Sequence, residues 1–216
     1  MAYFPICQVC GIPISEHSVD CADNEPYSAT FCRNNHGHLI GNFFESMLDM
    51  ESDDGGLCHF HEGRCCKASL SDYDFAVVCF PCQPWSSLGN RKNRAAPNQH
   101  KYWSAVFGAE GSAISLVRRK HPRIVLFENV DGFRTLLDDS GRTGLQRLED
   151  EMYGIKVGGS RFYRGSASVR ITTDCWGAPG RSRLLDIIIM IDTNYNAKRF
   201  SISLRVDFIK RLKHSD

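Results

Sequence analysis

Apolar stretches of strand length alternate along this chain with stretches whose apolar positions recur at helical spacing. Two near-continuous apolar runs, 74–80 and 123–127, have the composition of strands buried on both faces. Between them, residues 102–119 place apolar side chains at helical spacing and end next to basic residues, which suits a helix C-terminus. The pattern predicts two neighbouring parallel strands joined by a helical crossover.

The alternation continues on both sides of this unit. Less regular segments predict strands at 15–21 and 186–191 and helices at 25–35, 144–153 and 201–212. Strands that alternate with helices predict an α/β fold with a mostly parallel sheet. In such sheets the chemistry lies beyond the carboxyl ends of the strands.

Two polar segments interrupt the pattern and are predicted to be loops. Residues 49–71 begin with acidic residues and glycines and continue into a stretch rich in cysteine and histidine. Residues 89–101 are polar and basic and lack any apolar period. The second loop therefore offers a local positive surface.

The composition is that of an ordinary globular protein. The 216 residues include 26 Lys and Arg against 25 Asp and Glu, a net charge of +1, with 42% hydrophobic residues. This balance excludes wholesale disorder and a polycationic tail. A nucleic acid would have to bind a local basic face.

The sequence predicts an intracellular protein, in the nucleus of a eukaryote or the cytoplasm of a prokaryote. No apolar run reaches the roughly 18 residues of a membrane span, and we expect no membrane partner. The first residues lack the basic and apolar pattern of a signal peptide. We therefore expect the ten cysteines to be free thiols, metal ligands or a nucleophile rather than disulfides.

A thiol and a carboxyl group follow the two central predicted strands. Pro81-Cys82-Gln83 comes after 74–80, and Glu128-Asn129-Val130 comes after 123–127. Because the carboxyl ends of parallel neighbours meet at one sheet edge, both groups should face a common crevice. A thiolate can attack an electron-poor carbon while a carboxylic acid protonates the ring under attack.

These two motifs, in this order and spacing, resemble the signature motifs of the cytosine-C5 DNA methyltransferases. Residues 176–183 resemble a later motif of that family, whose arginines contact the cytosine and the DNA. Residues 19–27 resemble its second cofactor motif, in which an acidic residue binds the ribose of S-adenosylmethionine. The resemblance covers roughly residues 10–191. It implies a Rossmann-like S-adenosylmethionine-dependent methyltransferase fold.

The resemblance also implies a mechanism on a cytosine flipped out of double-stranded DNA. Cys82 would add to C6, Glu128 would hold N3 and the exocyclic amine, and C5 would take the methyl group. Asn129 would fix either the Cys82 loop or the Glu128 carboxyl. Arg183, with Arg181 beside it, would hold the flipped base.

Further candidates bind the cofactor and the DNA. For S-adenosylmethionine they are Asp23, with Glu25 as the second choice, and Pro81. The residues expected to contact DNA lie in the Cys82 loop and in the basic loop after it; they are Gln83, Ser86, Arg91, Lys92 and Arg94.

The chain departs from the family at several points. No glycine precedes Gly11, so the Phe-x-Gly-x-Gly cofactor turn is missing, and residues 40–43 lack the acidic residue of the third cofactor motif. The family's glutamine before the arginines is Gly180. We therefore expect a truncated catalytic domain at 1–191, with the start of a truncated recognition region at 192–216.

Two classes of function remain open. The first is a DNA cytosine-C5 methyltransferase. The second is an inactive remnant that binds DNA or a partner such as a full-length methyltransferase. The sequence does not separate DNA from RNA as the substrate.

Each candidate also has a purely structural interpretation. Cys82 could be a buried thiol, Glu128 a turn cap, and the two arginines ordinary surface residues. Asp23 and Glu25 could simply favour the start of the following helix.

The cysteine- and histidine-rich stretch has two interpretations as well. Its possible zinc ligands are Cys58, His59, His61, Cys65 and Cys66, and Cys7-x-x-Cys10 offers a further pair. Because the spacing contains no regular pair within 58–66, we interpret the stretch as a solvated loop and predict no metal site.

Overall fold

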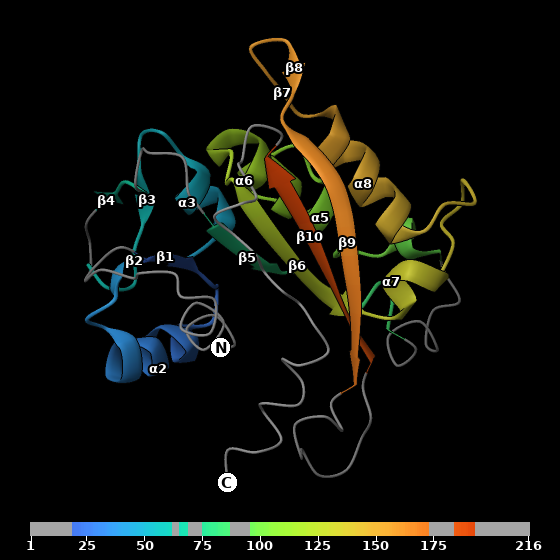
Figure 1. Cartoon of the computed structure of the whole chain (residues 1–216). Helices are drawn as coiled ribbons and strands as arrows, with labels where there is room; N and C mark the ends of the chain where they lie inside the picture. Colours follow the sequence, from blue (N-terminus) through green and yellow to red (C-terminus); the bar gives the residue numbers. More distant parts are fainter. Residues whose placement is uncertain (1–18, 62–64, 69–74, 87–95, 173–183, 193–216) are drawn as a thin grey trace, which may run out of the picture. The chain divides into compact units, whose positions relative to one another are not determined.

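The computed structural model describes most of the chain between residues 19 and 192 (Figure 1). The described residues are 19–61, 65–68, 75–86, 96–172 and 184–192. They fall into two compact units. The first unit contains residues 19–68 and 104–122, and the second contains 75–103 and 123–192.

The first unit contains two short parallel strands, β1 (Val19–Ala22) and β2 (Ile40–Phe44), joined through helix α2 (Pro26–His36). The helix expected at 25–35 is confirmed. Its first turn holds Pro26, where a missing N–H costs no helical hydrogen bond. The apolar faces of these elements enclose a small core of Val19, Ala29, Ile40 and Phe43.

The segment expected to be a loop at 49–71 is irregular over most of its described residues but includes short elements. Helix α3 (Met47–Glu51) ends within it, and it contains the antiparallel strands β3 (Gly56–Leu57) and β4 (Cys65–Cys66). Ser46 begins α3, because its hydroxyl accepts a hydrogen bond from the Asp49 N–H at 3.1 Å. These elements are too short to produce a periodic pattern.

The single helix expected at 102–119 is broken into α5 (Ser104–Phe107) and α6 (Ala113–Lys120). Gly111 adopts a φ of +60° between them, and Ser112 starts α6 with a capping box. The buried Glu51 carboxylate then accepts hydrogen bonds from the Ser115 hydroxyl at 2.7 Å and the Gly111 N–H at 3.1 Å. These bonds tie α3 to α6.

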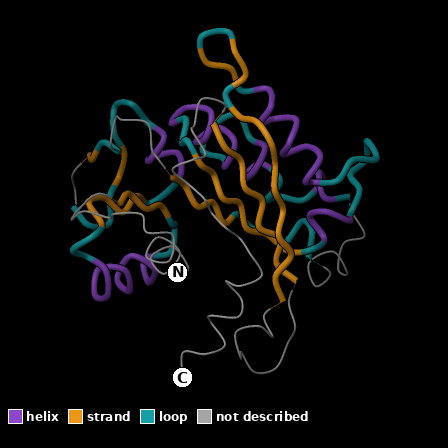
Figure 2. The backbone as a smooth tube through the Cα atoms, viewed as in Figure 1, coloured by secondary structure: helices purple, strands orange, loops and turns teal. Residues whose placement is uncertain are grey.

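The second unit is built on one mixed sheet in the order β5-β6-β10-β9 (Figure 2). The strands are β5 (Phe75–Cys79), β6 (Ile124–Val130), β9 (Tyr163–Thr172) and β10 (Leu184–Asp192). The pair β5–β6 is parallel, and β10 is antiparallel to both β6 and β9. Of the three strand pairs in this sheet, only β5–β6 is parallel, because β10 runs opposite to the other three strands.

The predicted strands 74–80, 123–127 and 186–191 correspond to β5, β6 and β10. The sequence analysis missed β9, because its residues mix glycine, serine and arginine with few apolar positions. The expected helix at 201–212 and the motif at 176–183 lie outside the described residues.

Short elements complete the second unit. Helix α8 (Gly144–Gly154) confirms the helix expected at 144–153 and packs beside β9, with Leu148 and Met152 fully buried. The others are η1 (Pro97–Gln99), α7 (Gly132–Thr135), β7 (Lys156–Val157) and β8 (Ser160–Arg161). No helix in the described part of the chain is long and apolar enough to cross a lipid bilayer.

A buried carboxylate organises the loop between α7 and α8. The Asp138 carboxylate accepts hydrogen bonds from the Ser140 hydroxyl at 2.6 Å, from the Arg142 N–H at 3.1 Å and from the Arg147 guanidinium. Burial alone would raise the pKa of Asp138, but these donors outweigh burial and lower the pKa of this carboxyl below its ordinary value.

We expect Asp138→Asn to lower the free energy of unfolding by about 2–4 kcal/mol, because it leaves the Arg147 guanidinium without its buried partner. A lowered pKa stabilises the fold above the unfolded-state pKa of about 3.9, and this stabilisation is lost as the pH falls through the folded-state pKa. Denaturant titrations between neutral and acidic pH should therefore converge for wild type and variant at low pH. Asp150→Asn, which removes the exposed Arg142–Asp150 pair, is the control and should change stability by less than about 1 kcal/mol.

Candidate active site

The parallel pairing of β5 and β6 brings the two sequence motifs together. Cys79, the last residue of β5, lies directly opposite Glu128 in the register. The expected pairing of these two strands is confirmed. The second motif lies within β6 rather than after it, since Val130 pairs with Leu185 of β10 and the ladder continues to that residue.

Glu128 is half-buried and hydrogen-bonded to the Cys79 thiol. Burial raises the pKa of Glu128, and the bond to Cys79 opposes this shift only in part. Cys79 as a residue is exposed, but desolvation of its thiol by neighbouring atoms and the nearby Glu128 charge raise its pKa to about 11. Cys79 therefore stays a thiol and donates to the carboxyl group, which is itself biased toward its protonated form.

Sequence reasoning did not single out Cys79. The signal that could have identified it is positional: in a parallel pair, the residue across from the motif glutamate is the last residue of the preceding strand. Counting the register backward from the first motif would have reached Cys79, three residues before Cys82.

Asn129 connects β6 to the chain that leads into the Cys82 loop. Its side chain is buried, and its Nδ2 donates a hydrogen bond to the Phe80 carbonyl at 3.2 Å. Its Oδ1 accepts from the Val130 N–H at 2.9 Å. The sequence left two roles open for Asn129, to fix the Cys82 loop or to fix the Glu128 carboxyl group. The bond to Phe80, which precedes the loop, matches the first role.

Residues 81–86 form a compact turn around the Cys82 carbonyl. This oxygen accepts hydrogen bonds from the Trp85 N–H at 3.0 Å and the Ser86 N–H at 2.8 Å. Cys82 and Pro81 are half-buried, and Gln83 is exposed. The turn therefore holds the backbone of Cys82 while leaving part of its side chain accessible.

The far side of the turn is fixed by an aromatic cluster. Trp85 is 1% exposed and packs edge-on against Phe133, with ring centroids 4.7 Å apart, and against Phe80 at 5.9 Å. A side chain at position 132 would bring its Cβ to 1.9 Å from the Trp85 carbonyl oxygen, so only Gly132 fits there. Cys82 thus lies between two anchors, the Asn129 bond and the Trp85 cluster.

The predicted basic loop is described only from residue 96 onward. There η1 is attached to Asp139, whose Oδ2 accepts from Asn98 at 3.1 Å and from Gln99 at 2.8 Å. This end of the loop is therefore fixed. The candidates Arg91, Lys92, Arg94, Arg181 and Arg183 lie outside the described residues.

The cofactor candidates of the first unit lie at the carboxyl end of β1. Asp23 and Glu25 are both exposed, and Asp23 Oδ1 accepts a hydrogen bond from the Glu25 N–H at 2.9 Å. This bond is the one expected if Asp23 helps to start α2. An exposed carboxylate after a parallel strand is also suited to bind ribose hydroxyls, so the geometry fits both interpretations.

The segment 40–43, which lacks the acidic residue of the third cofactor motif, contains a hydrogen-bonded asparagine. Asn42 lies on β2, and its Nδ2 donates a hydrogen bond to Asp20 Oδ1 at 2.9 Å. A carboxylate at position 42 would face the Asp20 carboxylate at the same distance and repel it.

Comparisons with known proteins agree with the two motifs. Residues 54–158 match the family model described as C-5 cytosine-specific DNA methylase. The segment contains Cys82 and Glu128. The match agrees with the family that the sequence motifs resemble, and the observed strands and helices agree with the predicted α/β class.

Individual relatives are distant and longer. A Type II methyltransferase of Bacillus subtilis, M.BsuFI, is 32% identical over 74 residues, which are 34% of this chain and 16% of that protein. The solved methyltransferase EhMeth of Entamoeba histolytica is 14% identical, with a TM-score of 0.44 over 78% of this chain and 43% of its own. The Dnmt2 methyltransferase of S. pombe is 17% identical, with a TM-score of 0.41 over 84% and 45%. The chain spans less than half the length of each.

We expect Gly132→Ala to destabilise the second unit by about 2 kcal/mol or more, because the added Cβ would overlap the Trp85 carbonyl oxygen. The displaced turn should also label faster with iodoacetamide at Cys82, which peptide mass spectrometry can follow. Gly154→Ala is the matched control, since no atom lies within 4 Å of its added Cβ. Equal stability and equal labelling in the two variants would contradict the anchoring of the turn.

Proposed function

We propose that this chain transfers a methyl group from S-adenosylmethionine to carbon 5 of a cytosine in DNA, since residues 54–158 match the family model of the C-5 cytosine-specific DNA methylases. One observation carries the proposal. The register of β5 and β6 sets Glu128 beside the end of the strand that leads into the Cys82 turn, and Asn129 is hydrogen-bonded to that connection.

In the proposed reaction the Cys82 thiolate adds to C6 of a flipped cytosine. As the sulfur bond forms, the C5=C6 π pair moves to C4=C5, the C4=N3 π pair moves to N3, and Glu128 donates a proton to N3. The resulting enamine is nucleophilic at C5. The direction of the Glu128 pKa shift supports this role, since burial favours the protonated carboxyl group that a proton donor needs. After transfer, loss of the C5 proton and of the thiol restores the aromatic ring.

Three residues are proposed for the cofactor: Asp23 or Glu25 for the ribose hydroxyls and Pro81 beside the reacting centre. The exposed carboxylates at the end of β1 fit hydroxyl groups, which they can accept hydrogen bonds from. The cofactor would supply the electrophilic methyl group.

DNA is the proposed substrate. Gln83 and Ser86 flank the exposed side of the Cys82 turn, while Arg91, Lys92 and Arg94 would contact phosphates and Arg181 and Arg183 the base. We propose an intracellular site of action, where DNA is found.

The alternative proposal is a non-catalytic remnant that binds DNA or a partner such as a full-length methyltransferase. The absence of an acidic residue from 40–43, where the resemblance places the third cofactor motif, favours that alternative.

The first experiment traps the covalent adduct. We expect the chain, incubated with S-adenosylmethionine and DNA containing 5-fluorocytosine, to give a shifted band on a denaturing gel, because the fluorine blocks the final elimination. Cys82→Ala should abolish the band, whereas Cys32→Ala, which changes a half-buried thiol of α2, should preserve it. No band from folded wild-type protein would refute the enzyme and favour the non-catalytic alternative.

The second experiment tests the acid. Glu128→Gln should slow adduct formation by about 10²- to 10⁴-fold, the usual contribution of a positioned acid. In wild type, the rate should fall as the pH rises through the raised pKa of Glu128, because the carboxyl group loses the proton it donates. The variant should lack this limb of the pH profile. An unchanged profile in Glu128→Gln would assign the proton donor to another group.

A further inference from the structure

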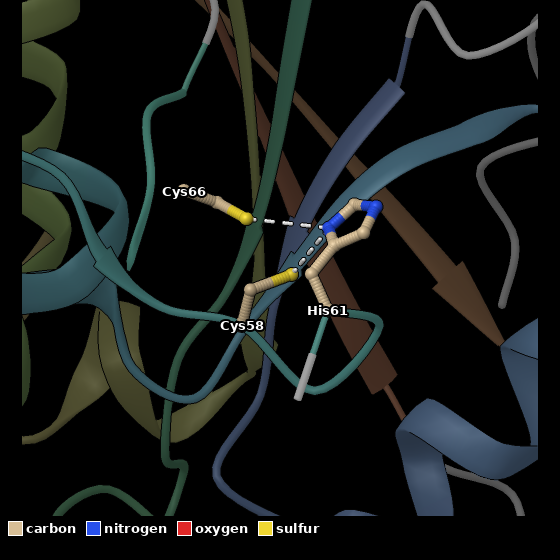
Figure 3. A group of neighbouring side chains, drawn as sticks. All are labelled: Cys58, His61 and Cys66. Carbon is tan, nitrogen blue, oxygen red and sulfur yellow. Dashed lines mark hydrogen bonds between the residues drawn. The ribbon is translucent and has the colours of Figure 1, made fainter. Parts of the chain in front are cut away.

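Three metal-ligating side chains converge in the first unit, away from the Cys82 turn in the sequence. Cys58, His61 and Cys66 place their two sulfur atoms and one ring nitrogen within 4.8 Å of one another (Figure 3). We propose that these residues bind one zinc ion, or a comparable thiophilic divalent metal, that stabilises the first unit.

The distances match a tetrahedral site. His61 Nδ1 lies 3.4 Å from Cys58 Sγ and 3.2 Å from Cys66 Sγ. Zinc binds sulfur at about 2.3 Å and nitrogen at about 2.0 Å, so tetrahedral angles separate the two ligand atoms by about 3.6 Å. Small side-chain adjustments would admit the ion. Both sulfurs approach the same nitrogen, as Figure 3 shows, so the three ligand atoms lie close enough together to surround one ion.

The backbone supplies this arrangement from separate parts of the chain. The β3–β4 pairing sets Gly56 opposite Cys66 and so brings the second cysteine back toward the first. Cys58 follows β3 and forms an isolated bridge with Phe44 at the end of β2. The His61 N–H donates to the Cys58 carbonyl at 3.3 Å, which folds the chain between the two ligands into a turn.

A backbone donor orients the Cys58 sulfur. This sulfur is buried and accepts a hydrogen bond from the Phe43 N–H at 3.3 Å. Such bonds to ligand sulfur orient the thiolate and stabilise its charge in metal sites. Two thiolates and a neutral imidazole around a divalent cation give a site without net charge, which suits its partial burial.

His59, another candidate of this stretch, has different surroundings. It points its Nε2 to the Asp23 carbonyl at 3.3 Å, and its ring is tilted against that of Phe43, with ring centroids 5.9 Å apart. It is therefore a suitable control residue. With three ligands from the described residues, a fourth coordination position remains for water or another donor.

Metal binding would attach the β3–β4 pair to the end of β2. Because His59 directly follows Cys58 and contacts the Asp23 carbonyl, the site would also support the chain around the proposed ribose-binding residue. This role is structural and does not depend on methyl transfer.

The test is cobalt substitution of the full chain. We expect the protein purified without chelator to carry one zinc ion per chain, as measured by elemental mass spectrometry. After exchange, cobalt should give the intense visible bands of a tetrahedral site and a sulfur-to-cobalt charge-transfer band. Cys66→Ser and His61→Asn should lose stoichiometric metal, while His59→Asn and Cys32→Ser should retain it. Metal removal should lower the melting temperature of the wild type and of the variants that retain metal. It should leave the melting temperatures of Cys66→Ser and His61→Asn unchanged.

Several outcomes would overturn the proposal. These are absence of stoichiometric metal in folded wild-type protein, the weak spectrum of octahedral cobalt, a Cys58–Cys66 disulfide under reducing purification, or metal retained by both ligand variants. Should a variant fail to fold, the wild-type cobalt spectrum decides whether the metal has cysteine ligands, because the charge-transfer band appears only when thiolate sulfur binds the cobalt.

Discussion

The hydrogen-bonded parallel pairing of β5 with β6 is the constraint on which the candidate site depends. It fixes the register in which Cys79 opposes Glu128, and a shift by one residue would turn the glutamate to the other face of the sheet. The same register lets Asn129 reach the Phe80 carbonyl. A carboxyl group of raised pKa and a restrained cysteine turn are both consequences of this one alignment.

Rigidity around Cys82 comes from packing as well as from hydrogen bonds. The Trp85 ring fills a buried aromatic cluster, and Gly132 permits the backbone approach that seats it. The first unit uses a different device, since its short strands and small core offer little apolar burial. There, buried polar links such as Glu51 with Ser115, together with the proposed metal at Cys58, would compensate.

The sequence predicted those parts whose signal is local. Continuous apolar runs identified β5, β6 and β10. The first motif follows β5, whereas the second forms the last three residues of β6. The helix at 102–119 was predicted as one because apolar spacing ignores the left-handed backbone at Gly111. β2 was missed because glycine and asparagine dilute its apolar pattern. The Cys79–Glu128 and Cys58–His61–Cys66 groupings depend on strand pairing, which spacing alone does not encode.

The hydrogen bond between Asn42 and Asp20 makes the pairing of β1 and β2 sensitive to charge. The parallel register sets the two residues opposite each other, and the amide donates to the carboxylate at 2.9 Å. Replacing Asn42 with aspartate would exchange this bond for repulsion between two carboxylates. The two strands are therefore joined through side chains as well as through the backbone, at a junction that carries a single negative charge.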